Sequence, residues 1–136
     1  MSLELEMYER FRFYEISLEE KRRIVEKLRK ILGERKEILL VAIYGSFLKD
    51  YPFRDIDIAL YIRPGMDPLD YKFMLEKKLS IEIGYPVDVK VLNNAPAWFI
   101  LEVFENGEIL LDRSGIAEKV YKRALDEIIS LKRAHV

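Results

Sequence analysis

Two short motifs lie close together in the sequence and have the residue types of a phosphate and metal site. Gly45 and Ser46 end a run of apolar residues, and Asp55 and Asp57 begin nine residues after the serine. Glycine permits a tight turn and a close approach of the backbone to a ligand, and the amides after Ser46 can donate to phosphate oxygens. Carboxylates are hard oxygen ligands that Mg²⁺ binds together with substrate phosphates. The motifs therefore predict a site that holds a divalent metal and a triphosphate together.

The aspartate pair alternates with apolar residues, as expected within one strand. Side chains in a strand alternate between faces, so Asp55 and Asp57 project together while Ile56 and Ile58 enter the core. Two carboxylates repel each other by about 4 kcal/mol at a separation of about 4 Å and an effective dielectric constant of about 20. Because a bound cation relieves this repulsion, the pair is predicted to bind metal.

A third carboxylate and two cationic residues complete the candidate site. Asp88 lies between Val87 and Val89 in a later alternating segment, and it reaches the same metals if the two strands are neighbours. Three aspartates can hold two Mg²⁺ ions, one activating an acceptor hydroxyl and one binding the triphosphate. Lys49 or Arg54 would add positive charge near the phosphates. Each motif alone is most often an ordinary turn or a solvated strand, but their combination on consecutive elements favours the site.

Hydrophobic periodicity predicts a small sheet flanked by helices. Ser17 and Glu20 form a capping box before an apolar stripe at helical spacing that ends at Gly33. The continuously apolar residues 38–44 are typical of a strand covered on both faces, with residues 55–62 expected beside it. Further helices are predicted at residues 67–83, 96–104 and 114–133, and further strands at 87–92 and 108–111. The last helix is expected to bury Ile116, Val120, Leu125 and Ile128. This order predicts an α/β or α+β fold with a small mixed β-sheet.

Composition limits the class of protein. The 136 residues, half of them apolar, predict one domain at residues 17–136 after an N-terminal extension at residues 1–16. The net charge of −1 gives no basic field for nucleic acid. Cysteine is absent and His135 is the only histidine, so acid–base and metal work is expected from carboxylates. No leader or long apolar run is present, which predicts a soluble cytoplasmic protein. Abundant Glu, Lys and Arg, without Thr or Gln, is typical of a high-temperature source.

The combination of motifs closely resembles the DNA polymerase β-like nucleotidyltransferase superfamily, and in particular its minimal nucleotidyltransferase (MNT) family. The resemblance extends over residues 38–111 and includes the strand with Asp88 and the Gly107–Leu110 segment. Two positions depart from the usual pattern: Arg54 stands where a small residue is common, and Asp50 where glycine is common. The resemblance implies nucleotide or phosphate binding by Gly45, Ser46, Lys49 and Arg54, and catalytic and metal-binding roles for Asp55, Asp57 and Asp88.

By resemblance, an Mg²⁺-dependent (or Mn²⁺-dependent) enzyme would transfer AMP or another NMP from an NTP to a hydroxyl. MNT proteins are similar to antitoxins that modify a tyrosine of a HEPN-domain toxin, so a HEPN partner and a homodimer or hetero-oligomer are expected. The alternatives are a non-catalytic antitoxin that neutralises its partner by contact and a small-molecule nucleotidyltransferase. Aromatic residues are expected either to form the partner interface or to pack on the core, namely Tyr8, Phe11, Phe13, Tyr14, Trp98 and Phe99.

Overall fold

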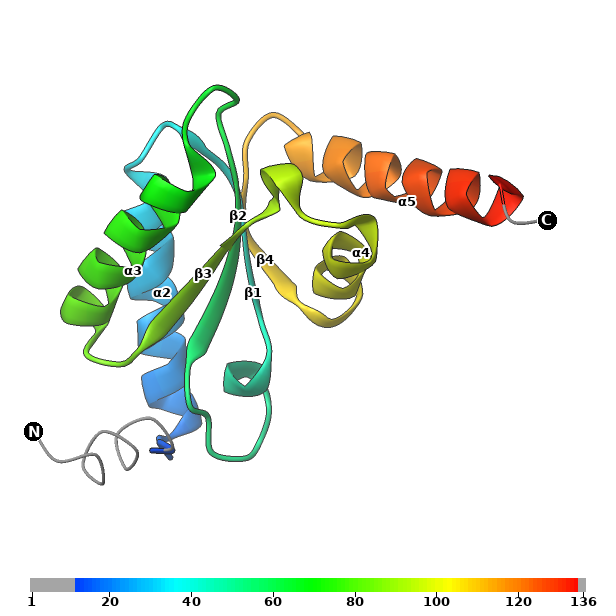
Figure 1. The fold of residues 1–136 in the computed structure, drawn as a ribbon. Coiled ribbons are helices and arrows are strands. Elements are labelled where there is room, and N and C mark those ends of the chain that lie inside the picture. Colours follow the sequence, from blue (N-terminus) through cyan, green and yellow to red (C-terminus); the bar gives the residue numbers. More distant parts are fainter. Residues whose placement is uncertain (1–11, 135–136) are drawn as a thin grey trace, which may run out of the picture.

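The computed structural model describes residues 12–134 and shows four helices and four strands in that part of the chain (Figure 1). The strands are β1 (Ile38–Tyr44), β2 (Ile56–Ile62), β3 (Val87–Val91) and β4 (Glu108–Asp112). The helices are α2 (Leu18–Gly33), α3 (Pro68–Ile83), α4 (Ala97–Asn106) and α5 (Ile116–Ala134), with short helical turns η1 (Ser46–Leu48) and η2 (Leu92–Asn94). The predicted mixed sheet flanked by helices is confirmed.

The strands form one sheet in the order β3-β2-β1-β4. β1 is antiparallel to both of its neighbours, whereas β2 and β3 are parallel. Leu40, Val41 and Ile43 of β1 are fully buried, which explains the continuous apolar run of this central strand. The expected pairing of β1 with β2 is confirmed, and β3 lies directly beside β2 as the metal-site prediction requires.

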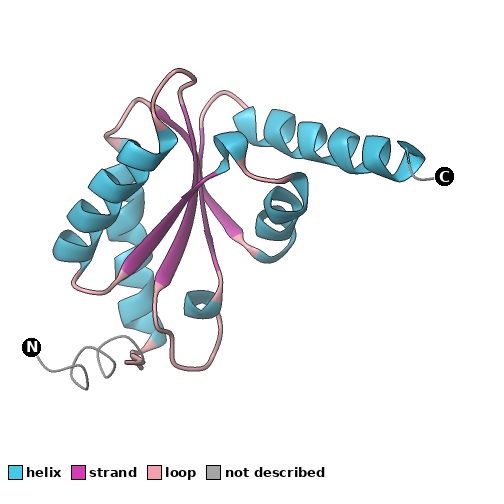
Figure 2. Cartoon of the chain, viewed as in Figure 1, coloured by secondary structure: helices cyan, strands magenta, loops and turns pink. Residues whose placement is uncertain are grey.

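Helices cover both faces of the sheet and give three layers (Figure 2). α2 and α3 pack on one face, where Ile56, Ile58 and Leu60 of β2 join a core of large aliphatic side chains. α4 and α5 pack on the other face, where the strands contribute small residues such as Ala42 and Ala59. Because a fully buried large aliphatic side chain stabilises by about 1.5–3 kcal/mol, the α2/α3 side supplies most of the hydrophobic stabilisation.

Local capping signals determine where α2 and α3 begin and end. The Ser17 hydroxyl accepts a hydrogen bond from the Glu20 amide at 3.0 Å, so this half of the predicted capping box is confirmed. The Glu20 carboxylate pairs with Arg23 at 3.1 Å instead. Asp67 caps α3 by accepting from two backbone amides at 2.9 and 3.2 Å, and Gly84 ends it in the left-handed conformation.

The last helix begins later than predicted. Ser114 and Gly115 have positive φ angles of 56° and 71°, so neither is helical and α5 begins at Ile116. Its C-terminal half projects beyond the sheet, so fewer side chains are buried than predicted (Figure 1). Of the expected positions, Val120 is buried, and those only partly buried are Ile116, Leu125 and Ile128. Neither α5 nor any other helix in residues 12–134 has both the length and the apolar character needed to cross a bilayer.

The described part of the N-terminal extension packs against the body of the protein. Tyr14 exchanges two backbone hydrogen bonds with Phe53, at 2.8 and 3.0 Å, and their rings are in contact. Of the two roles predicted for the aromatic residues, core packing therefore applies to Tyr14. Phe13 is exposed, and Tyr8 and Phe11 lie outside the described residues.

Candidate active site

The sheet brings the predicted carboxylates together where β2 and β3 begin. Asp57 and Asp88 are directly paired positions of these parallel strands, and Tyr44 at the end of β1 pairs with Asp57 on its other side. Asp55 lies directly before β2, and its negative charge acts on the Asp57 carboxyl group. The alternate residues of both strands enter the core on the α2/α3 side, so Asp57 and Asp88 lie on the opposite side of the sheet. The predicted juxtaposition of the three strands is confirmed.

The pKa of the Asp57 carboxyl group is raised by its surroundings. Burial raises the pKa of Asp57 to about 6, and the negative charges of Asp88 and Asp55 add to this increase. The positive charges of Lys90 and Arg54 partly offset it. Negative charge that raises the pKa of a neighbouring carboxyl group in this way also stabilises a divalent cation placed there.

The turn after β1 lies directly against Asp57. Gly45 has a φ of 83°, which other residues disfavour, and a Cβ atom at this position would collide with the Asp57 carboxylate. The chain then forms η1, and the amides of Ser46 and Phe47 at its start have no acceptor within the turn. The tight turn and close approach predicted from Gly45 are therefore present, while phosphate binding by Gly45 and Ser46 stays a prediction.

Lys21 of α2 holds this turn in place. Its Nζ donates hydrogen bonds to the carbonyl oxygens of Phe47 at 2.8 Å and Lys49 at 2.9 Å. The same ammonium lies 5.2 and 5.6 Å from the ring centroids of Phe47 and Phe53, within cation–π range. Because the end of a helical turn leaves carbonyl groups without partners, Lys21 completes the turn from outside it. Lys21 is therefore a positioning residue, which the sequence pattern did not mark because it stands on a charged helix face.

The two predicted phosphate-binding cations lie in different places. Arg54 is adjacent to the carboxylates, with its Nε 3.7 Å from the Asp55 Oδ2. Lys49 and Asp50 line a groove of about 650 Å³ between α2 and the loop that contains η1. The structure thus brings Arg54 to the carboxylate cluster and places Lys49 along α2, and phosphate binding by either residue stays a prediction.

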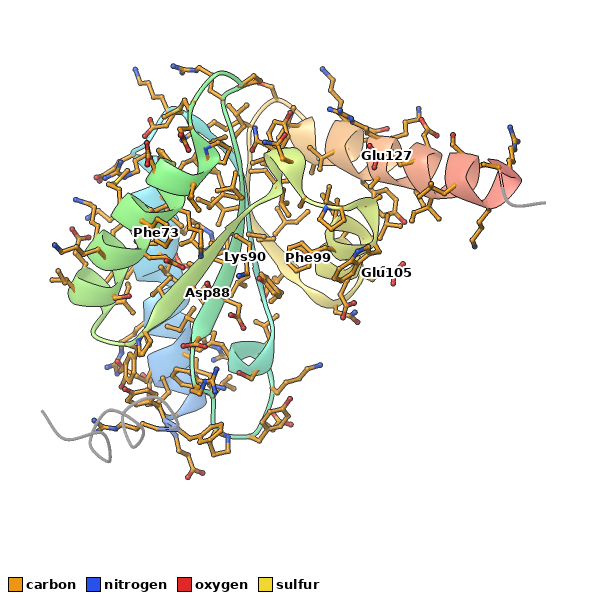
Figure 3. The ribbon with its side chains drawn as sticks, in the orientation of Figure 1. Phe73, Asp88, Lys90, Phe99, Glu105 and Glu127 are labelled. Atoms are coloured by element: carbon orange, nitrogen blue, oxygen red, sulfur yellow. The ribbon has the colours of Figure 1, made fainter. Side chains whose placement is uncertain are left out.

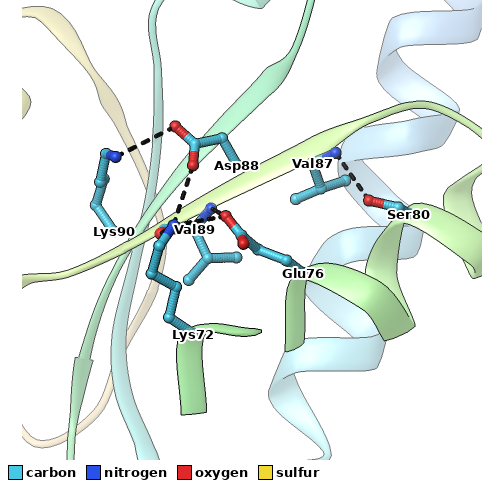
Figure 4. A network of polar contacts seen from close by, with 7 residues as sticks. All are labelled: Lys72, Glu76, Ser80, Val87, Asp88, Val89 and Lys90. Atoms are coloured by element: carbon cyan, nitrogen blue, oxygen red, sulfur yellow. Dashed lines mark hydrogen bonds and ion pairs between the residues drawn. The ribbon is translucent and has the colours of Figure 1, made fainter. Parts of the chain in front are cut away.

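Asp88 is held by a polar network that reaches across from α3 (Figure 4). The Lys72 Nζ donates to the Glu76 carboxylate and the Val89 carbonyl, both at 2.7 Å, and to the Asp88 Oδ1 at 3.3 Å. The Lys90 Nζ lies 3.7 Å from the other oxygen of Asp88. Burial alone would raise the pKa of Asp88, but hydrogen bonding and the charges of Lys90 and Lys72 outweigh it and lower the value. Asp88 is therefore ionised and oriented before any ligand binds.

The three aspartate carboxylates fit a divalent metal whose remaining ligands come from a bound substrate. Among residues 12–134, no group of three or more Asp, Glu, His or Cys side chains is positioned to hold a metal ion, and Asp88 contacts two lysines. Mg²⁺ is usually bound by one or two carboxylates together with water and substrate phosphates, and not by an all-protein cage. Asp55, Asp57 and Asp88 would supply the hard oxygen donors for such an arrangement, and metal binding by them stays a prediction. The residues therefore fit metal binding in which triphosphate oxygens complete the coordination.

Sequence reasoning missed the α3 residues that support Asp88. Lys72, Glu76 and Ser80 are spaced four residues apart, which places them on one helix face. The Glu76 carboxylate accepts from the Val89 amide at 2.8 Å, and the Ser80 hydroxyl accepts from the Val87 amide at 3.0 Å. This polar row was the available signal, but it is recognisable only once α3 is known to pack along β3.

Solved structures that share this fold include toxin–antitoxin complexes. A chain of the tri-AMPylated Shewanella oneidensis HEPN toxin in complex with MNT antitoxin is 21% identical, with a TM-score of 0.68 over 84% of this chain and 91% of that chain. A toxin–antitoxin structure with AMP-PNP is 22% identical, with a TM-score of 0.69 over 81% and 90% of the two chains. The MntA–HepT toxin–antitoxin is 20% identical, with a TM-score of 0.67 over 83% and 91%. These structural neighbours are MNT antitoxins with HEPN toxins.

The family is established by sequence. No curated protein gave a significant match to the chain. The family described as polymerase beta, nucleotidyltransferase matches residues 26–115, well over half of the chain, including every strand of the described sheet and the three aspartates. Together with the paired carboxylates and the glycine turn, this match shows that the chain belongs to the polymerase β nucleotidyltransferase family.

Proposed function

We propose that the protein transfers a nucleoside monophosphate, with ATP as the donor and AMP as the transferred group, to a hydroxyl acceptor in the presence of Mg²⁺. The observation that carries this proposal is the meeting of two features at Asp57. The Asp88 carboxylate is its partner on the adjacent parallel strand, and the Gly45 turn lies against its side chain. A phosphate-binding turn and a carboxylate cluster at one point are what nucleotidyl transfer needs.

Each site residue has a distinct role in this proposal. Asp55 and Asp57 would hold the metal ions, with Asp88 as a further ligand. Bound Mg²⁺, or Mn²⁺ in its place, neutralises charge on the triphosphate and lowers the pKa of the acceptor hydroxyl. Gly45 and Ser46 donate backbone and hydroxyl hydrogen bonds to the phosphates, and the cationic side chains that add positive charge beside them are Lys49 and Arg54.

The proposed reaction is an in-line displacement. The acceptor oxygen forms a bond to the α-phosphorus, the bond from that phosphorus to the bridging oxygen breaks, and pyrophosphate leaves. The hydroxyl would give its proton to solvent water once a bound metal has lowered its pKa, and Asp88 would help to activate it as a ligand of that metal. Because cysteine is absent and the single histidine is His135, metal coordination by the carboxylates would do most of the hydroxyl activation.

The acceptor in this proposal is a tyrosine of a HEPN-domain partner protein. Support comes from the neighbouring structures, in which an MNT antitoxin is bound to a tri-AMPylated HEPN toxin and a toxin–antitoxin is bound to AMP-PNP. In residues 12–134 the sheet and its helices leave no separate domain to bind an acceptor, so a partner subunit would complete the site. A cytoplasmic location belongs to the proposal, since nucleoside triphosphates are available there.

Intact-mass spectrometry tests the activity. The protein is mixed with Mg²⁺ and each NTP in turn, with and without the protein encoded beside it, and every species is weighed. We expect the mass of one or more AMP groups on the partner, formed with ATP, together with released pyrophosphate. Asp55→Ala/Asp57→Ala is expected to abolish both products while leaving the protein folded.

Two other activities give different results in the same experiment. A non-catalytic antitoxin would inhibit its partner equally well as wild type and as Asp55→Ala/Asp57→Ala, with no adduct and no pyrophosphate under any condition. A small-molecule nucleotidyltransferase would release pyrophosphate only when a small hydroxyl compound is added. Either result would exclude protein nucleotidylation.

A further inference from the structure

An apolar pocket lies immediately beside Asp88. Its volume is about 530 Å³, and apart from two lysines it is lined by apolar residues from the start of α3, the end of β3 and the start of α4. The lysines, Lys72 and Lys90, are the two that contact the Asp88 carboxylate, at 3.3 and 3.7 Å. Lys90 and Phe99 line it from β3 and α4 respectively (Figure 3). The pocket is therefore connected to Asp88 through these two lysines.

The position of this pocket places it on the acceptor side of the proposed reaction. The Gly45 turn follows β1, Asp57 lies on β2 and Asp88 lies on β3, so Asp57 stands between the phosphate turn and Asp88. In an in-line displacement the nucleophile and the leaving pyrophosphate lie on opposite sides of the α-phosphorus. With pyrophosphate at the Gly45 turn, the nucleophile therefore approaches from the Asp88 side, where the pocket lies.

The rim of the pocket has the character of a protein-binding surface. Trp98 and Leu69, which line it, expose 63% and 58% of their surface, and Phe73, one turn beyond Leu69 on α3, exposes 57%. α3 already buries Tyr71, Leu75 and Leu79 against the sheet, so Leu69 and Phe73, four residues apart, form a second apolar face of this helix. Contiguous apolar side chains on a surface mark sites of interaction with other proteins.

We infer that this pocket, named here the Trp98 pocket, binds the side chain of an acceptor tyrosine presented by a protein partner, with Leu69 and Phe73 extending the contact. The inference rests on the proposed function and assigns its acceptor subsite. The apolar walls match an aromatic ring, and the lysines at the Asp88 end match a hydroxyl that becomes negatively charged. A phenol, with an ordinary pKa of about 10, ionises more readily than an aliphatic alcohol, which suits a site without histidine. A cationic sugar would meet two like charges and few polar partners there.

The fluorescence of Trp98 tests occupancy directly, because it is the only tryptophan in the chain. The probe is N-acetyl-tyrosinamide, titrated into the wild-type protein with Mg²⁺ and a non-hydrolysable ATP analogue, with N-acetyl-serinamide as the control. We expect a saturable change in Trp98 emission with the tyrosine probe and none with the serine probe. If the ATP analogue alone causes the saturable change and excludes the tyrosine probe, the pocket holds the nucleobase and the inference is wrong.

A pair of α3 variants tests the pocket in transfer. Leu69→Glu places a charge at the pocket, whereas Ile81→Glu places the same charge at a position of the same helix that is 72% exposed. Transfer of AMP to N-acetyl-tyrosinamide is followed by mass spectrometry. We expect Leu69→Glu to raise the KM for the tyrosine probe about tenfold, without changing the KM for ATP or the Tm. Ile81→Glu is expected to match the wild type.

The results separate a wrong pocket from a wrong function. If the wild type binds ATP and transfers AMP but Leu69→Glu behaves as Ile81→Glu does, the pocket assignment fails and the nucleotidyltransferase proposal stands. If the wild type neither binds ATP in the presence of Mg²⁺ nor forms any product, both are wrong.

Discussion

The two faces of the sheet are formed by the same strands but differ in role: one packs a hydrophobic core, and the other carries the carboxylate cluster. On the α2/α3 face, β2 presents Ile56, Ile58 and Leu60, all fully buried, to a core of large aliphatic residues. On the opposite face, the alternate positions of the same strand include Asp57, whose ionisation the surroundings disfavour. The α2/α3 face thus supplies most of the hydrophobic stabilisation, and the other face keeps charged groups together at a cost to stability. The comparison shows how a short chain combines both within a strand of seven residues.

The largest effect should come from the charged face. Asp57→Asn removes a ligand of both proposed metals, and we expect transfer to fall at least about a thousandfold. Intact-mass measurement of AMP transfer and calorimetric titration with Mn²⁺ would both show the loss. Asp126→Asn, an exposed carboxylate on α5, is the matched control and should retain wild-type activity. Transfer at the wild-type rate by Asp57→Asn would contradict the site assignment.

Substitution of Ile58, the residue after Asp57, should lower stability and leave metal affinity unchanged. Ile58 is fully buried, and Ile58→Ala leaves a cavity in the α2/α3 core, so we expect the free energy of unfolding to fall by about 3 kcal/mol. Urea titration measures this change, and Mn²⁺ affinity at low urea should stay near the wild-type value. Ile129→Ala, at an exposed position of α5, should change stability by less than about 0.5 kcal/mol. Equal losses in the two variants would mean that the two faces do not differ as described.

Substitution of two glycines with positive φ distinguishes the effect of backbone strain on stability from the effect of the Gly45 turn on metal affinity. Gly45→Ala and Gly65→Ala should each lose about 1–2 kcal/mol of stability, because both positions favour glycine. Only Gly45→Ala should also lower Mn²⁺ affinity, by about tenfold, since its Cβ displaces the Asp57 carboxylate whereas Gly65 has open space around it. Calorimetry on both variants gives the comparison, and equal affinities would show that the turn and Asp57 are independent.

Two Lys–Glu pairs on α3 test the network behind Asp88. Lys72→Met removes a half-buried ammonium that bonds Glu76 and the Val89 carbonyl, so we expect a loss of about 1–2 kcal/mol. Lys78→Met removes an exposed pair with Glu82 and should cost less than about 0.5 kcal/mol. Thermal unfolding distinguishes the two, and Lys72→Arg should recover part of the loss. An unchanged Tm for Lys72→Met would indicate that the network contributes no stability.

The smallest effect is a pH dependence of stability in the absence of metal. Because the pKa of Asp57 is raised from 3.8 to about 6 on folding, the folded chain binds more protons than the unfolded chain between these values. Stability contributed by this group is therefore present below the unfolded pKa and is lost as pH rises through about 6. Allowing for solvent screening, we expect Asp57→Asn to be about 1 kcal/mol more stable than wild type near pH 7, and equal to it near pH 4. Urea titrations in EDTA at both pH values would test this, and a wild type that is the more stable near pH 7 would contradict it.

The strands and the shared face of Asp55 and Asp57 were predictable from the sequence, whereas the strand register and the residues that support the site were not. Period-two alternation places Asp55 and Asp57 on one face, and the apolar run at residues 38–44 identifies the central strand. Lys21 and Lys72 act through contacts with residues 26 and 17 positions away, to the carbonyls of Phe47 and Val89, and no local pattern encodes such contacts. The start of α5 was predicted two residues too early, because Ser114 has a left-handed backbone conformation that serine seldom adopts.

The α3 side chains that bond the backbone of β3 also determine whether another protein can add a strand to this edge of the sheet. β3 is an edge strand, and the peptide groups on such an edge ordinarily invite an added strand or aggregation. Here the amides of Val87 and Val89 and the carbonyl of Val89 are already bonded to α3. Sheet extension at this edge is therefore blocked, and a protein that reaches the Asp88 side must be recognised through its side chains and not by strand addition.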